Sequence, residues 1–149
     1  MNKIVVLSLS VLALVSLIVF LIVRANFMPL PKLRADRYVS VYSLNLGHFD
    51  GEHVKRFINL INETETTPQG FRDIYDIGES PDERITFSMA NGKKHCFCIR
   101  GNVIDYAIYN DAGERTGIRH RYIMTNPDIF FSELDIIKQE IMESLSDLK

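Results

Sequence analysis

The chain has 149 residues, of which 46% are hydrophobic, and 17 Lys and Arg stand against 19 Asp and Glu for a formal net charge of −2. This length fits one small domain better than two. The slightly acidic balance gives no electrostatic basis for binding nucleic acid, because phosphate neutralisation requires clustered basic residues.

The first feature in chain order is a run of twenty uncharged residues from Ile4 to Val23. As a helix this run is about 30 Å long, which matches the hydrocarbon core of a bilayer. A cleaved signal peptide has a shorter apolar region and small residues before the cut, whereas Arg24 stands where a small residue would be needed. The sequence therefore predicts an uncleaved transmembrane anchor at residues 1–24 that contacts the lipid bilayer through Ile4 to Val23.

Charges on the two sides of this segment bear on its orientation. Lys3 precedes it, and Arg24, Lys32, Arg34 and Arg37 come after it. Counting positive charges favours a cytoplasmic domain. A short polar head before a long apolar run is, in contrast, typical of a signal-anchor that exports the domain after it. We expect a single-pass membrane protein with an extracytoplasmic domain, and the cytoplasmic alternative stays open.

Residues 25–37 contain Pro29 and Pro31, which restrict the backbone and predict a short, stiff linker. The domain then occupies residues 38–149. Its first element, residues 38–46, is rich in aromatic and β-branched residues and predicts a strand.

An amphipathic helix of about three turns is predicted next, with Asp50 as its N-terminal cap. Its apolar residues recur at the helical spacing i, i+3, i+4, i+7. They are Val54, Phe57, Ile58 and Ile61.

The Asn91-Gly92 dipeptide lies between two strand-like runs and favours a hairpin with a two-residue type I′ turn. That turn would place Phe87 opposite Cys96 and Ile85 opposite Cys98. Both thiols would then lie on an apolar face. We interpret them as buried and inert rather than as a redox or metal site.

Strands at residues 103–109 and 118–124 extend this hairpin to a four-strand meander, and a shorter run at residues 71–77 also fits a strand. A long C-terminal helix begins at Asn126-Pro127. The fold class is α+β in the order β-α-β-β-β-β-α, an antiparallel sheet with two helices packed on it. The last helix carries an apolar stripe of Phe130, Leu134, Ile137, Ile141, Leu145 and Leu148.

Metal-ligand residue types concentrate at the junction between the first strand and the first helix of the domain. His48, Asp50 and His53 could hold a divalent metal through imidazole and carboxylate groups. The alternative is that acidic residues there only cap the helix and complement its dipole.

A second candidate site is the basic group Arg115, Arg119 and Arg121. Arg119 and Arg121 share one strand face and could bind a phosphate, a carboxylate or an acidic partner surface. Alternatively, these charges protect a solvent-facing edge strand from pairing with another chain.

No catalytic motif is present, and no cofactor is expected. The first hypothesis is a membrane-tethered, non-catalytic domain that binds a protein partner, either in an envelope complex or by neutralising a toxic protein. The alternative is a small membrane-attached hydrolase that uses a metal held by His48, Asp50 and His53. A third hypothesis is a lipid-proximal structural subunit.

Overall fold

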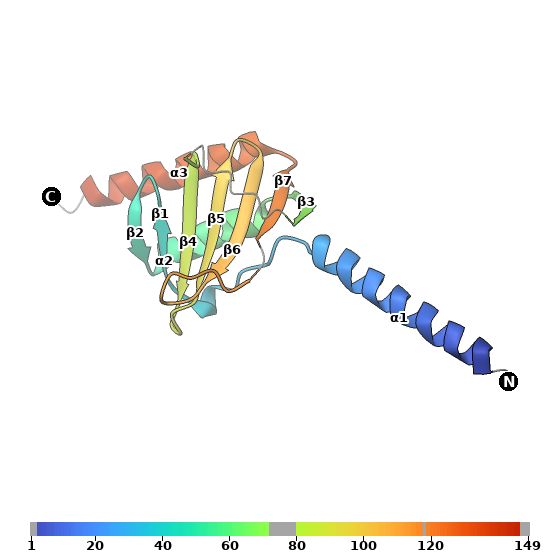
Figure 1. The fold of residues 1–149 in the computed structure, drawn as a ribbon. Coiled ribbons are helices and arrows are strands. Elements are labelled where there is room, and N and C mark those ends of the chain that lie inside the picture. The colour runs from blue at the N-terminus through green and yellow to red at the C-terminus, as the bar shows by residue number, and fades with distance from the viewer. Residues whose placement is uncertain (1–2, 72–79, 118, 147–149) are drawn as a thin grey trace.

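The computed structural model describes residues 3–71, 80–117 and 119–146, without the side chains of residues 3–8, 25–26, 70–71 and 145–146. Within these ranges the chain forms a small α+β domain with one antiparallel sheet in the order β2-β1-β4-β5-β6-β7-β3 (Figure 1). The strands are β1 (Tyr38–Ser43), β2 (Gly47–Asp50), β3 (Thr66–Phe71), β4 (Glu83–Met89), β5 (Lys94–Arg100), β6 (Val103–Tyr109) and β7 (His120–Met124). The helical elements are α1 (Lys3–Asn26), the 3-10 turn η1 (Ala35–Arg37), α2 (Glu52–Glu63) and α3 (Pro127–Ser146).

Helices α2 and α3 lie on the same side of the sheet, and α1 extends away from the domain (Figure 1). The predicted apolar stripe of α2 is confirmed, because Val54, Phe57, Ile58 and Ile61 are all buried. The core lies between these helices and the sheet. Among the described residues no helix covers the other face of the sheet, which we call the open face (Figure 1). On α3 the described part of the predicted stripe is also buried, and its members are Phe130, Leu134, Ile137 and Ile141.

The anchor predicted from Ile4 to Val23 falls within α1, of which the structure describes the side chains from residue 9 to residue 24. No helix in the described parts of the chain combines the length and the apolar character that crossing a membrane requires. The transmembrane helix of the predicted fold is therefore not found among these residues.

From Leu30 onward the predicted linker belongs to the domain. Leu30 and Leu33 are buried in the core. The Asn62 side chain holds the backbone of Leu33 from both sides, since its Oδ1 accepts from the Leu33 N–H at 2.7 Å and its Nδ2 donates to the Leu33 carbonyl at 2.8 Å. Only a few residues therefore separate α1 from the packed part of the chain.

The predicted four-strand meander is confirmed as β4-β5-β6-β7, but two strands were missed. The run predicted as one strand reverses after Ser43, where Gly47 has a φ of 99°, and returns as β2. The polar segment after α2 forms β3, an edge strand that tolerates Pro68. Of the strand predicted at residues 71–77, residues 72–77 lie outside the described chain.

The predicted register of the β4-β5 hairpin is wrong by one residue. Met89 pairs with Lys93 around a three-residue loop, with the Met89 N–H donating to the Lys93 carbonyl at 2.8 Å. Gly92 takes a φ of 80°, whereas Asn91 has no positive φ, so the loop is not type I′. Phe87 therefore pairs with His95, and both cysteines move from the core face to the open face.

Candidate functional site

A row of directly paired residues crosses the centre of the open sheet face. Arg84 on β4 pairs with Cys98 on β5, Cys98 pairs with Asp105 on β6, and Asp105 pairs with Arg121 on β7. Paired residues of adjacent strands point to the same face. Four ionisable side chains are thereby aligned across four strands.

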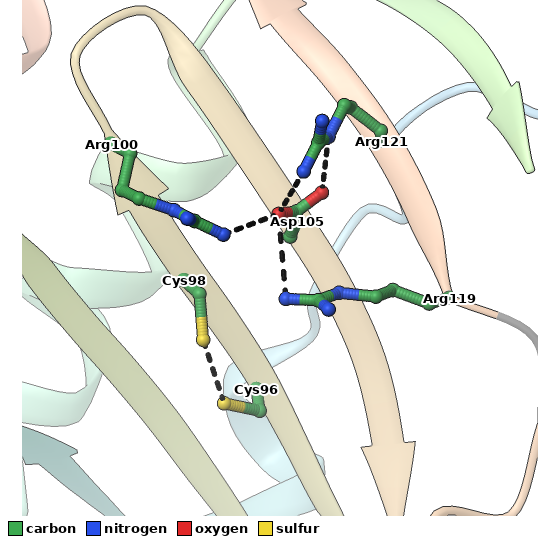
Figure 2. A network of polar contacts seen from close by, with 6 residues as sticks. All are labelled: Cys96, Cys98, Arg100, Asp105, Arg119 and Arg121. Carbon is green, nitrogen blue, oxygen red and sulfur yellow. Dashed lines mark hydrogen bonds and ion pairs between the residues drawn. The ribbon is translucent and has the colours of Figure 1, made fainter. Parts of the chain in front are cut away.

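Asp105 is the centre of this face, with only 2% of the residue exposed. Its carboxylate accepts two hydrogen bonds from Arg121, from Nε at 2.7 Å and from Nη2 at 2.8 Å. Arg100 and Arg119 approach the same carboxylate at 3.3 and 3.4 Å (Figure 2). Burial raises the pKa of Asp105, but the Arg121 hydrogen bonds and the three guanidinium charges outweigh it and hold that pKa below its ordinary value.

This group has an excess of positive charge. We use the name arginine face for the open sheet surface that carries Arg84, Arg100, Arg119 and Arg121 around Asp105. Among the described residues, the single carboxylate of Asp105 pairs with three guanidinium groups, and the side chains of Arg100 and Arg119 remain 20% and 26% exposed. The arrangement presents oriented N–H donors to solvent, as recognition of an anionic group requires.

Beside Asp105, the Cys96 and Cys98 thiols point toward one another with their sulfurs 3.8 Å apart (Figure 2). The hydrogen bond from Cys96 is the main cause that lowers the pKa of Cys98 to about 6; burial opposes it, and the hydrogen bond and charge of Arg84 assist it. The same contact, together with burial, raises the pKa of Cys96. The predicted burial is confirmed for Cys96, which is 7% exposed, but not for Cys98, which is partly exposed. The predicted core face was wrong for both thiols, because it depended on the incorrect hairpin register.

The predicted basic group is only partly brought together. Arg119 and Arg121 meet at Asp105, while Arg115 lies in the β6-β7 connection and pairs with Tyr109 in an isolated bridge. The edge-protection interpretation was wrong, because β7 pairs with β6 on one side and with β3 on the other. Whether the three arginines bind a partner stays a prediction.

The three predicted metal ligands lie on two elements. His48 and Asp50 are exposed on β2. His53 lies on α2, and its ring centroid is 5.6 Å from that of Phe49. Gly51, with a φ of 60°, occupies the N-cap position in place of Asp50, so the predicted cap was wrong. Across residues 3–71, 80–117 and 119–146, no group of three or more His, Cys, Asp or Glu side chains is placed to hold a metal ion.

Sequence reasoning missed Asp105, Arg84 and Arg100. A signal was available for Asp105, because an acidic residue inside the apolar run VIDYAIY requires a cation once it is buried. No local pattern identifies Arg84 or Arg100 as its neighbours.

A groove of about 380 Å³ lies on the helical side of the domain, between α2 and the first half of α3. Arg56, Asn59, Glu63 and Glu133 are among its lining residues. It shares no residue with the arginine face.

Comparison of the chain with protein-family models, with curated proteins and with solved structures finds no match.

Proposed function

We propose that this chain is a membrane-tethered, non-catalytic domain that binds an acidic surface of a protein partner through the arginine face. The observation that carries the proposal is the convergence of Arg100, Arg119 and Arg121 on the buried carboxylate of Asp105, on a sheet face that no helix of the described chain covers.

Charge complementarity defines the chemistry of the partner. In the described part of the chain, Arg100 and Arg119 share one carboxylate and stay partly exposed, and planar guanidinium groups match carboxylates with two parallel hydrogen bonds. Arginine is also enriched at the centres of protein interfaces.

Preorganisation favours a protein surface over lipid headgroups. Asp105 already holds Arg100 and Arg119 in place, so a partner has less side-chain freedom to remove on binding. Guanidinium N–H donors held in fixed positions bind most tightly to a surface whose acceptor atoms lie at matching positions. A fluid headgroup layer gains less from such fixed geometry.

Two observations support the proposed membrane tether: the apolar sequence from Ile4 to Val23, and the solvent exposure of the side chains described in this segment. Every side chain from Leu9 to Arg24 is exposed, and α1 extends away from the domain (Figure 1). Apart from Ser10, Ser16 and Arg24 these side chains are apolar, and an exposed apolar surface of this size favours an apolar environment. We place the domain on the extracytoplasmic side, as a component of an envelope complex or as a neutraliser of a toxic protein.

Photo-crosslinking in cells tests the binding face on the full chain. A photo-reactive residue at Thr67, exposed on the open face, should crosslink to a protein, and one at Asn59 in the helical groove should not. Charge reversal at Arg84 and Arg119 should abolish the adduct, whereas reversal at the exposed Arg34 and Arg56 should leave it unchanged. Thermal unfolding must show that both double variants remain folded.

The adduct must then be reproduced with the purified protein that it identifies. Binding of this protein should weaken as salt rises, because exposed charges are screened. Equal crosslinking from Asn59, adducts with phospholipid alone, or an adduct that survives reversal of Arg84 and Arg119 would each overturn the proposed face.

The tether and its orientation have a separate test. A tag on Lys149 in intact cells or spheroplasts should be removed by an external protease if the domain is extracytoplasmic. Removal only after the membrane is opened would place the domain in the cytoplasm. Recovery of the chain in the soluble fraction after carbonate extraction would overturn the tether itself.

A further inference from the structure

The two cysteines form a ligand pair that the proposed binding function does not use. Cys96 and Cys98 are two residues apart on β5 and therefore project from the same face. Their sulfurs approach to 3.8 Å (Figure 2). Cys96 is 7% exposed, and the Cys98 residue is partly open to solvent.

The sheet holds the backbone of this pair on both sides. Cys96 pairs with Thr86 and with Ala107, and Cys98 pairs with Arg84 and with Asp105. Residues two apart on a strand are separated by roughly 6.6 Å along it. This Cα spacing lies near the upper limit of about 6.8 Å for a disulfide, so forming one here would strain a backbone that both neighbouring strands hold in register.

A metal ion between the sulfurs meets no such obstacle. Two metal–sulfur bonds of about 2.3 Å place the sulfurs at most ~4.6 Å apart, when the sulfur–metal–sulfur angle is about 180°. The observed 3.8 Å separation therefore has to increase only slightly for the angle to approach this value. Small rotations of the two side chains achieve this. The backbone of β5 can stay in register.

Ligand type, number and charge select the metal. Thiolates prefer soft ions such as Cu(I) and Zn(II). Zn(II) requires about four ligands, and the described side chains around the pair supply no third His, Cys, Asp or Glu in position. A complex of Cu(I) with two thiolates is complete with two ligands.

The surroundings of the pair also favour this complex. Cu(I) bound to two thiolates carries one negative charge, Arg84 pairs directly with Cys98 across β4 and β5, and Arg119 lies nearby (Figure 2). A neutral complex of Zn(II) with two thiolates would gain much less from these cations.

We propose that Cys96 and Cys98 bind one Cu(I) ion on the open face of the sheet. Two sulfur–copper bonds form, any protons on the two thiols pass to solvent, and copper stays in the +1 state, so no oxidant or reductant is consumed. The two thiolates bind the ion without the protein partner proposed above, although Arg84 and Arg119 lie beside both sites.

Copper competition on the full chain in detergent tests this site under anaerobic conditions. The chain should withdraw one equivalent of Cu(I) from its coloured bicinchoninate complex. Cys96→Ser and Cys98→Ser should each weaken binding by more than the roughly 10–100-fold effect of an outer-shell change. If thermal melting shows that a serine variant is not folded, the test is repeated with Cys96→Ala and Cys98→Ala.

The control is His48→Asn together with His53→Asn, which removes two imidazoles and should leave Cu(I) binding unchanged. Failure to withdraw copper, binding that persists after both cysteines are replaced, or Zn(II) binding as tight as Cu(I) binding would each overturn the proposal.

Discussion

The guanidinium of Arg121 meets the carboxylate of Asp105 through two parallel hydrogen bonds, Nε to Oδ1 at 2.7 Å and Nη2 to Oδ2 at 2.8 Å. This pair joins β7 to β6 at a position where Asp105 is 2% exposed. Asp105 also holds the guanidinium groups of Arg100 and Arg119 at the same point. The pair is therefore both a structural contact and the base of the proposed binding face.

Asp105→Asn should destabilise the domain by roughly 2–4 kcal/mol, because it leaves partly buried arginines without their counter-charge. The measurement is chemical unfolding of the full chain in detergent. Asp36→Asn is the matched control, since Asp36 pairs with Arg34 on the surface and should cost less than about 1 kcal/mol. Equal losses for the two variants would contradict the structural role of Asp105.

The depressed pKa of Asp105 predicts an acid-dependent stability. The folded pKa lies below the unfolded one, so the unfolded chain binds more protons and stability falls as the pH drops. The contribution is complete above about pH 4, the ordinary pKa of an aspartate, and is lost as the pH falls through the folded pKa of Asp105. Unfolding from pH 6 to pH 2.5 should show a shallower decline in Asp105→Asn than in the parent chain.

Glu83→Gln should cost roughly 1–3 kcal/mol, because it turns one acceptor of a buried carboxylate into a donor. Glu83 is 1% exposed, and its Oε1 accepts from the N–H groups of Leu44 and Arg84 at 2.8 Å each, while Oε2 accepts from Asn45 at 3.0 Å. Thermal unfolding measures the loss.

The control for this carboxylate is Glu140→Gln, which removes a surface ion pair with Arg56 and should change stability by less than about 1 kcal/mol. A Glu83→Gln protein as stable as its parent would show that the buried acceptor site is not formed.

Gly92→Ala tests the three-residue hairpin loop. The position has a φ of 80°, and an added Cβ would lie 2.9 Å from the Cβ of Asp111. We expect a loss of more than about 1 kcal/mol, the usual backbone penalty for a side chain at positive φ. Gly113→Ala has a similar φ of 79° without a neighbour within 4 Å and should show the backbone penalty alone. Adding Asp111→Gly to the Gly92→Ala variant should restore the part of the stability loss by which Gly92→Ala exceeds Gly113→Ala.

Alkylation by iodoacetamide should report the lowered pKa of Cys98. The thiolate is the nucleophile, so the rate should rise with a midpoint near pH 6, well below that of an ordinary cysteine. Cys96→Ala should move the midpoint upward the most, because its hydrogen bond is the largest cause of the shift, and Arg84→Ala should move it less. A midpoint near the ordinary cysteine pKa of about 8.5 in the parent chain would contradict the geometry of the pair.

Local patterns were sufficient for the helices and for the central meander. In α2 and α3, apolar residues recur with the helical period, and a helix with such a stripe has to bury it. Turn dipeptides between β-rich runs determined which strands succeed one another, from β4 to β7. Strands joined by short turns are normally neighbours, so the order of this segment needed no tertiary information.

The face of each cysteine was beyond local patterns. The side-chain period of a strand is two residues, so one extra residue in the loop at Asn91-Gly92 reverses the assignment of Cys96 and Cys98. The edge strands β2 and β3 were also missed, because short polar segments become strands only when a partner strand supplies hydrogen bonds.

By itself the sequence determined the α+β class, the meander, the two amphipathic helices and the apolar segment from Ile4 to Val23, since each depends on residues close together in the chain. Only the tertiary structure decided that Arg84, Cys98, Asp105 and Arg121 form one row. These four residues belong to four different strands. The strand register aligns them, and this register results from the loop geometry and from the packing of the opposite sheet face. The candidate site is therefore a property of the assembled sheet.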